Sequence, residues 1–207
     1  RCIDPLLSDE SGSKLNFCAD NVYEEWENST DIRGTQLVFC DLSTPKKPYL
    51  EYEYGKDFDA YNDLKHKLIE RGIPENEIAF IHDANTDKAK QDLFDKVTAG
   101  TIRVLIGSTE KCGAGTNVQK RLVALHHLDA PYRPRDLIQR NGRGIRQGNM
   151  NKSIRIYTYA TERTFDSYSY QILENKQRFI SQVEKGDMTV READDIDEAT
   201  LSYAEIK

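Results

Sequence analysis

The feature that most constrains this sequence is an alternation of short apolar runs with longer amphipathic segments. Five runs have the length of a β-strand and lie at residues 36–41, 78–82, 101–106, 122–128 and 154–159. Segments with a helical pattern lie between them at residues 58–71, 86–99 and 134–141. Strands that are apolar on both faces and are separated by helices are typical of βα units. The chain is therefore predicted to form an α/β domain with a parallel sheet that helices cover on both faces.

Two further helices are expected outside this alternation. Residues 14–28 carry apolar side chains at helical spacing, and a second such pattern runs from after Thr161 to about Val183. Beyond Gly186 the chain is acidic, and we expect a solvated or partner-docked helix there. These patterns predict three regions: an N-terminal tail and docking helix at 1–32, a central lobe at 33–162, and a C-terminal helical extension with an acidic tail at 163–207.

The charge of the chain is unevenly distributed. The net charge is −6 over 207 residues, but residues 101–150 carry nine Lys or Arg against three acids. From Glu184 to Lys207, eight acids stand against three bases. Local charge steers a phosphate backbone more than the total does, so a polyanion would bind the basic half.

The cysteines and the apolar runs of the sequence indicate the environment in which the protein works. The four cysteines are far apart and form no CxxC pair, so we expect a reduced, cytoplasmic protein without a metal site. No apolar run approaches the roughly 18 residues of a membrane span, so no membrane partner is expected. The chain opens on Arg1 rather than Met, and we expect it to be a piece of a longer protein.

The strongest motif is QRNGRGIRQG at residues 139–148. Arg143 and Arg146 are three residues apart and would project from one side of a helical turn. Two planar guanidiniums side by side suit the spread negative charge of a transferring γ-phosphate. Three glycines in this stretch would let a triphosphate and a second domain approach the backbone closely. The alternative is a solvated basic helix and turn, which would not need glycines at these places.

Two loops that follow predicted strands carry hydroxyl groups. Residues 107–117 read GSTEKCGAGTN, and residues 42–45 read LSTP. Exposed amides in a glycine-rich loop hydrogen-bond phosphate oxygens. The hydroxyls of Ser43 and Thr44 are suited to a DNA phosphate, although an ordinary strand-to-turn ending explains them as well.

Taken together, these segments resemble the motifs of superfamily-two helicases in order and spacing over residues 33–160. QLVFCDLSTP at 36–45 resembles motif IV, and VLIGSTEKCGAGTN at 104–117 resembles motif V in its Swi/Snf form. Residues 139–148 resemble motif VI, which reads QxxGRxxR, and residues 124–134 resemble the Swi/Snf turn that follows a strand. The wording HHLDAP and GRGIRQGN is most similar to the helicase part of DNA methylase–helicase proteins of phages and mobile elements.

The resemblance implies the C-terminal RecA-like lobe of a Swi/Snf-type DNA helicase or translocase. Its fold would be a three-layer α/β sandwich around a parallel sheet, with helical extensions at both termini. ATP and Mg²⁺ would bind between this lobe and an N-terminal lobe, with Arg146 as the arginine finger and Arg143 as its companion. The other implied nucleotide contacts are Gly113, Gly115, Asn117, Gln139 and Gly142. The implied nucleic-acid contacts are Ser43, Thr44, Ser108, Thr109 and Lys111.

Two departures from the family pattern matter. Gly142 stands where a Swi/Snf motif VI usually carries an acid. The sequence also contains no GxxxxGK[ST] phosphate loop and no apolar strand that ends in Asp-Glu. The magnesium ligands are therefore expected on the N-terminal lobe, and this chain alone is not expected to hydrolyse ATP. The expected partners are double-stranded DNA, that N-terminal lobe and a fused DNA methylase.

Other interpretations of the same residues were weighed. A non-catalytic RecA-like module for DNA docking or protein interaction is disfavoured, because such a lobe has no reason to keep both arginines. A DEAD-box RNA helicase usually has His at the position of Gln139, so Gln139 favours a DNA translocase. His126 and His127 are adjacent on a predicted strand and point to opposite faces, so we expect structural roles for them rather than joint metal binding.

Overall fold

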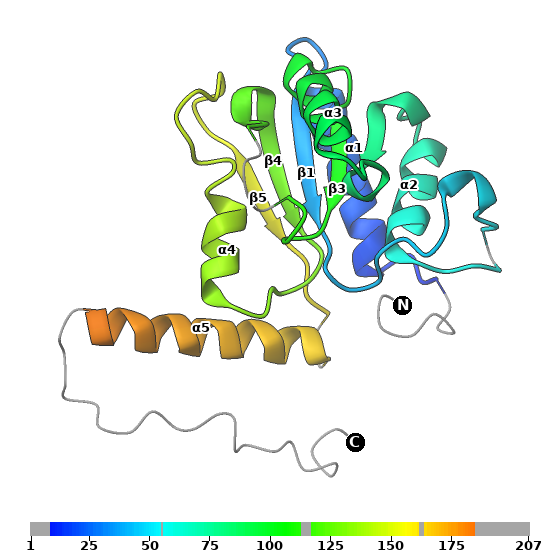
Figure 1. Cartoon of the computed structure of the whole chain (residues 1–207). Coiled ribbons are helices and arrows are strands. Elements are labelled where there is room, and N and C mark those ends of the chain that lie inside the picture. Colours follow the sequence, from blue (N-terminus) through cyan, green and yellow to red (C-terminus); the bar gives the residue numbers. More distant parts are fainter. Residues whose placement is uncertain (1–8, 55, 113–116, 162–163, 185–207) are drawn as a thin grey trace.

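The computed structural model describes residues 9–54, 56–112, 117–161 and 164–184 (Figure 1). Five strands form one sheet in the order β2-β3-β1-β4-β5, and every neighbouring pair is parallel. The strands are β1 (Thr35–Phe39), β2 (Ile78–Phe80), β3 (Val104–Gly107), β4 (Leu122–His127) and β5 (Arg155–Thr158). Because all five run the same way, their carboxyl ends meet at one edge of the sheet, where ligands gather in folds of this kind.

Five helices of eight residues or more surround the sheet. They are α1 (Lys14–Asn28), α2 (Ala60–Glu70), α3 (Asp87–Ala99), α4 (Pro134–Asn141) and α5 (Phe165–Glu184). Ser13, Asp59 and Thr86 accept backbone N–H groups at the starts of α1, α2 and α3, as N-cap side chains do. Gly100 ends α3 with a φ of 78°, a conformation that glycine adopts without strain. Within the described part of the chain, no helix combines the length and apolarity that crossing a bilayer requires.

The hydrophobic core consists of two clusters, one on each face of the sheet. The first joins α1 and α2 to side chains such as Val38 and Ile106, and the second joins α3 to side chains such as Leu37 and Leu105. Successive residues of one strand therefore enter opposite clusters, as the period-two geometry of a strand requires. The predicted three-layer sandwich with a parallel sheet and helices at both ends is confirmed.

The last strand differs from the expectation of a strand buried on both faces. β5 pairs only with β4 and is largely exposed, with Ile156 at 40% exposure. A carboxylate of α1 tethers this edge, because Tyr157 Oη donates to Glu25 Oε1 at 2.7 Å and Arg155 pairs with the same oxygen. The prediction failed here because a pattern of apolar residues does not distinguish a central strand from an edge strand.

His126 and His127 are both fully buried at the end of β4. The two ring nitrogens of His126 lie 2.9 Å from Gln36 Oε1 and 2.8 Å from Tyr159 Oη. His127 points to the other face, where its Nε2 lies 2.9 Å from Asn141 Oδ1 at the end of α4. The two imidazoles therefore point to opposite faces and are bonded to side chains of the fold, and no cluster of three potential metal ligands occurs within the described ranges.

Arg140 joins the carboxyl ends of three strands to α4. Its guanidinium is buried, and Nη2 lies 2.7 Å from Asp41 Oδ2 and 3.0 Å from Asp129 Oδ1. Nη1 donates to the Asp129 carbonyl at 2.8 Å, and Nε donates to Thr109 Oγ1 at 2.7 Å. Asp129 also accepts the backbone N–H groups of Asp41 and Leu42. One side chain therefore ties the loops after β1, β3 and β4 to the helix that precedes the arginine motif.

The charges of this network depend on one another. Burial raises the pKa of Asp129 above its ordinary value, and the Arg140 guanidinium acts in the opposite direction. Buried charges are tolerated when they are paired and hydrogen-bonded, and each group here has several partners. Removing the cation leaves Asp129 buried and Asp41 without its ion pair.

We predict that Arg140→Leu lowers the free energy of unfolding by about 3–5 kcal/mol, the usual cost of breaking a buried ion pair. Equilibrium unfolding in urea measures this change. Arg135→Leu is the matched control, because Arg135 is exposed on the same helix and such surface changes stay within about 0.5 kcal/mol. Equal losses in the two variants would contradict the role assigned to Arg140.

The buried histidines predict a dependence of stability on pH. Burial lowers the pKa of His126 to about 3 and that of His127 to about 4. Both are neutral in the folded protein and gain protons on unfolding below their ordinary pKa of about 6.5. Their contribution is thus complete above pH ~6.5 and is lost as the pH falls toward 4, by about 1.4 kcal/mol per pH unit for each histidine.

His126→Gln tests this dependence. Urea unfolding between pH 5 and 7.5 should show a shallower loss of stability than in the parent chain, by about 1.4 kcal/mol per pH unit below pH 6. Equal slopes for the two chains would mean that His126 does not remain neutral in the fold.

Candidate functional site

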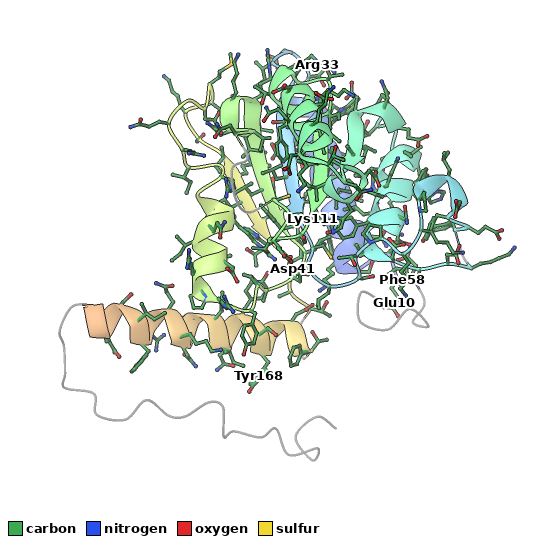
Figure 2. All side chains as sticks on the ribbon, in the orientation of Figure 1. Glu10, Arg33, Asp41, Phe58, Lys111 and Tyr168 are labelled. Atoms are coloured by element: carbon green, nitrogen blue, oxygen red, sulfur yellow. The ribbon has the colours of Figure 1, made fainter. Side chains whose placement is uncertain are left out.

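A cleft of about 780 Å³ opens at the carboxyl edge of the sheet. It gathers side chains from the loops after β1, β2 and β3 and from the start of α4. They are Asp41, Thr44, His82, Ser108, Thr109, Glu110, Lys111, Arg133, Asp136 and Gln139. Figure 2 shows Asp41 and Lys111 near the ends of the strands. The cleft thus brings together residues from all three motifs, which lie up to about a hundred positions apart in the sequence.

The cleft carries both signs of charge, and its cations come from two elements. Lys111 and Arg133 are both exposed in it. His82 lies between β2 and α3, where burial and then the charge of Lys111 lower its pKa. The imidazole is therefore neutral near pH 7, and its buried Nδ1 has no hydrogen-bond partner within the described residues. Neutral imidazole beside two cations suits an anion with further hydrogen-bonding groups.

The hydroxyl residues predicted to contact nucleic acid differ in their surroundings. The Thr109 hydroxyl donates to Asp41 Oδ2 at 2.7 Å and accepts from Arg140, so its proton is used inside the lobe. The Ser43 hydroxyl accepts the N–H of Ala60 at 3.0 Å and keeps its own proton as a donor. Ser43 has a φ of 59° and is not part of the cleft wall, whereas Thr44 and Ser108 are.

Arg143 and Arg146 lie outside this cleft, beside the chain that follows β3. Arg146 Nη1 donates to Asn117 Oδ1 at 3.1 Å, and Arg143 is half-buried near Cys112. Burial lowers the pKa of Arg143, and the positive charge of Arg146 lowers it further. Two cations held close together favour a shared anion.

The backbone between these arginines is not the helical turn that their spacing predicts. α4 ends at Asn141, and residues 142–148 form turns and bends. Arg143 follows the helix directly, with its N–H bonded to the Arg140 carbonyl at 3.1 Å. Gly113 and Gly115, which were expected beside the nucleotide, lie outside the described residues.

The glycines of the motif have structural reasons for their presence. A Cβ at Gly144 would lie 2.0 Å from Ile154 Cδ1, so a side chain there would collide with the segment before β5. Gly148 has a φ of 93°, which side chains disfavour. Gly142 leaves more room, with the Ile138 carbonyl 3.1 Å from a built Cβ. Close approach of a nucleotide is thus not required to explain Gly144 or Gly148.

Sequence reasoning missed Arg140 and its partners Asp41 and Asp129. The basic half of the chain was treated as one polyanion-binding surface, but Arg103 and Arg140 are buried and bonded internally. A signal was present, because each acid follows an apolar strand by two positions. Two carboxylates at neighbouring strand ends require a buried cation.

A comparison with family models matches residues 31–148 to the helicase conserved C-terminal domain. A relative, Defense against restriction protein B of Escherichia phage P1, is 32% identical over 103 residues. That alignment covers 48% of this chain and 5% of the phage protein, so the chain spans only a small part of that relative.

Solved structures share the fold at low sequence identity. The C-terminal part of the Fun30 ATPase domain has a TM-score of 0.56 and 20% identity, covering 81% of this chain and 48% of that one. Helicase MrfA bound to DNA has a TM-score of 0.52 and 13% identity, covering 79% and 20%. S. cerevisiae Dbp5 bound to RNA and ADP BeF3 has a TM-score of 0.52 and 21% identity, covering 81% and 37%.

The all-parallel five-stranded sheet between helices, together with the likeness to these solved structures, shows a RecA-like fold. The family match extends from just before β1 to the end of the arginine motif, which is more than half of the 207 residues. The chain therefore belongs to the helicase conserved C-terminal domain family.

Proposed function

We propose that this lobe is the arginine-bearing half of an ATP-dependent DNA helicase or translocase of the Swi/Snf type. The observation that carries the proposal is the placement of two arginines, Arg143 and Arg146, in the turns that follow α4, with Arg143 N–H bonded to the Arg140 carbonyl and Arg146 bonded to Asn117. They lie outside the cleft that gathers motif residues from three loops, and Arg146 is bonded to Asn117 in the chain between β3 and β4. In the complete enzyme, ATP lies between this lobe and an N-terminal lobe.

The donor set of the arginine pair fits the polyphosphate of ATP. Each guanidinium offers a planar fork of N–H groups, and Arg146 is exposed and therefore able to reach a ligand on another lobe. Arg146 acts as the arginine finger that stabilises charge on the γ-phosphate, and Arg143 as its companion. Asn117 orients Arg146 through the 3.1 Å hydrogen bond, and Gln139 and Gly142 are further nucleotide contacts in this proposal.

Magnesium is assigned no ligand in this part of the molecule. The described residues hold no group of three His, Cys, Asp or Glu side chains suited to a metal ion. Mg²⁺ would neutralise charge on the phosphates of ATP, and in this proposal the N-terminal lobe binds it.

The cleft supports binding of a nucleic-acid backbone. Lys111 is exposed, and Ser108 and Thr44 present hydroxyls from neighbouring loops. In the proposal these three side chains contact phosphate oxygens. The Ser43 hydroxyl, which accepts the Ala60 N–H, donates its own hydrogen to a further phosphate oxygen. Thr109 holds its loop against Asp41 and positions the others, because its donor is already used.

Double-stranded DNA is the proposed substrate. The proposed protein partners are the N-terminal lobe and a fused DNA methylase. Gln139 in place of a histidine and the GxGxN wording after β3 support a Swi/Snf-type enzyme over an RNA helicase. The relationship to a phage protein supports a parent encoded by a phage or mobile element.

We predict that Arg146→Ala in the full-length parent lowers DNA-stimulated ATP hydrolysis by about 10³- to 10⁵-fold, the contribution of arginine fingers in phosphoryl transfer. Arg143→Ala should have a similar effect. Arg146→Lys should fail as well, because an ammonium cannot reproduce the forked donor set. Phosphate release at saturating ATP and DNA measures these rates.

Arg135→Ala is the control for this experiment. Arg135 is exposed on α4, outside the motif, and its removal should leave the rate within a few-fold of the parent. Thermal unfolding of each variant shows whether the fold is intact. Hydrolysis by Arg146→Ala at the parental rate would show that the arginine pair serves another purpose, such as a DNA-facing surface.

We predict that Lys111→Ala weakens binding to duplex DNA equally for unrelated sequences and reduces the slope of log K against log salt by about 0.9, the value for one phosphate contact. Fluorescence anisotropy at several salt concentrations measures both effects. Lys120→Ala is the matched control, since Lys120 is exposed before β4 at the opposite edge of the sheet. An equal loss from Lys120→Ala, or binding that is insensitive to salt, would contradict the cleft as the DNA site.

A further inference from the structure

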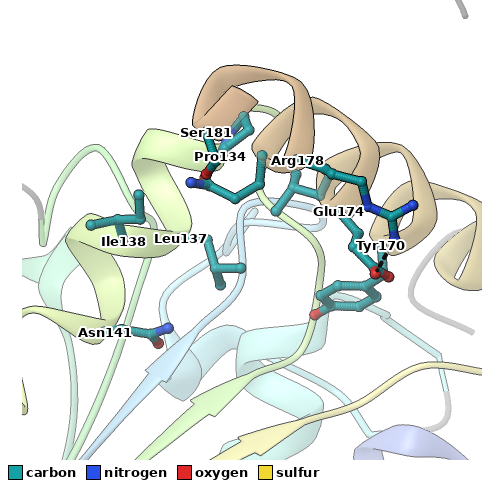
Figure 3. A pocket seen from close by; sticks show the side chains of 10 residues that line it. Pro134, Leu137, Ile138, Asn141, Tyr170, Glu174, Arg178 and Ser181 are labelled. Carbon is teal, nitrogen blue, oxygen red and sulfur yellow. Dashed lines mark hydrogen bonds and ion pairs between the residues drawn. The ribbon is translucent and has the colours of Figure 1, made fainter. Parts of the chain in front are cut away.

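An apolar groove of about 550 Å³ lies between α4 and α5. α5 crosses the end of the lobe below α4 (Figure 1). Figure 3 shows Leu137 of α4 and Tyr170 of α5 facing the space between the two helices. Pro134 and Leu173 complete its apolar wall, and the rim is polar, formed by Asn141, Glu174, Gln177, Arg178 and Ser181.

The groove is incompletely covered by the described residues. Ile138 lines it and is 60% exposed, and Phe179 and Ile180 farther along α5 are 46% and 40% exposed. The Tyr170 hydroxyl is buried there and has no hydrogen-bond partner among the residues described. A buried hydroxyl normally has a partner, so an additional element with an acceptor is expected at this place.

The chain itself supplies a segment of suitable length directly after α5. Residues 185–207 begin where the groove-lining helix ends. Between Tyr170 and Ser181, α5 lines about 17 Å of groove at 1.5 Å per residue, and a helix over residues 196–206 would span about 15 Å. Residues 185–195 in between are more than enough for the chain to reverse direction, since an extended chain covers about 3.3 Å per residue.

The sequence of this segment has one apolar face. Ile196, Ala199, Tyr203 and Ile206 recur at the spacing i, i+3, i+7 and i+10, which places them on one side of a helix. The other side carries acidic residues and a single large apolar residue, Leu201. An amphipathic face of this kind needs an apolar surface on which to pack.

The charges of the segment and of the groove are complementary. Residues 194–207 contain five acids and one base. On the groove rim Arg178 pairs with Glu174 at 3.0 Å, and outside the groove lining α4 and α5 carry two further cations, Arg135 and Lys176. Acidic side chains that flank the apolar face of the segment would be attracted to these cations.

We propose that residues 194–207 form an amphipathic helix that packs antiparallel to α5 in the α4–α5 groove, with Ile196, Tyr203 and Ile206 against Leu137 and Ile138. The segment buries the exposed face of α4 and makes α5 part of a three-helix layer. Because α4 ends at the arginine motif, the docked segment also restrains the helix that positions Arg143.

Cysteine labelling on the 207-residue chain tests this proposal. Ser181→Cys places a thiol on the groove wall with the change of one atom, in a Cys2→Ser background. Cys18, Cys40 and Cys112 are buried and should remain unlabelled while the lobe is folded, which reports on folding in every variant. Ile196→Asp and Tyr203→Asp each should speed maleimide labelling of the new thiol roughly tenfold, equivalent to about 1.4 kcal/mol of docking free energy.

Leu201→Asp is the matched control, because it introduces the same charge on the opposite face of the segment. Its labelling rate should equal that of the Ser181→Cys parent. Equal rates in all the variants would overturn the proposal. Protection that depends on protein concentration would overturn it too, because a second copy of the chain would then be the occupant.

Discussion

The buried guanidinium of Arg140 is the constraint on which the functional edge of this lobe depends. Parallel strands place their carboxyl ends together, and here two of those ends carry acids, Asp41 and Asp129. Asp129 is buried and Asp41 is partly exposed, and one arginine bonds both carboxylates because its guanidinium holds several donors in one plane, which lysine does not. Since that arginine belongs to α4, its bonds to the two carboxylates also hold α4 in position against the sheet edge. The direction in which Arg143 and Arg146 leave α4 then follows from the electrostatics of the sheet edge.

The fold could be predicted because burial on two faces leaves a simple trace in the sequence. Each central strand must supply apolar side chains to both core clusters, and this produces runs that no amphipathic helix contains. N-caps such as Thr86 and stops such as Gly100 then set the ends of the helices. β5 was the exception, because it lies at the edge of the sheet and its side chains are largely exposed, which the apolar pattern around Ile154 and Ile156 did not indicate.

The site could be predicted only in part, for a reason that Arg140 and Arg143 make clear. The two residues are the same type, three positions apart, and local patterns assign both to one basic surface. What separates them is the chain far away: Arg140 meets an acid 99 positions earlier, whereas Arg143 lies near Cys112 and Arg146. Thr109 is similar, because its hydroxyl is suited to a phosphate until Asp41 is placed beside it. Contacts between distant segments decide such roles, and residue spacing does not record them.

The contact between Gly144 and Ile154 has a consequence for how such motifs evolve. A methyl group at position 144 would force the end of the Ile154 side chain before β5 to move, whatever ligand the lobe binds. Purifying selection for packing alone would therefore preserve this glycine even in descendants that had lost the enzyme's chemistry. A paralogue without activity would keep glycine at position 144, while positions 143 and 146 would have lost their arginines. The arginines, and not the glycine pattern, are the residues that distinguish a working lobe from a scaffold among relatives of this chain.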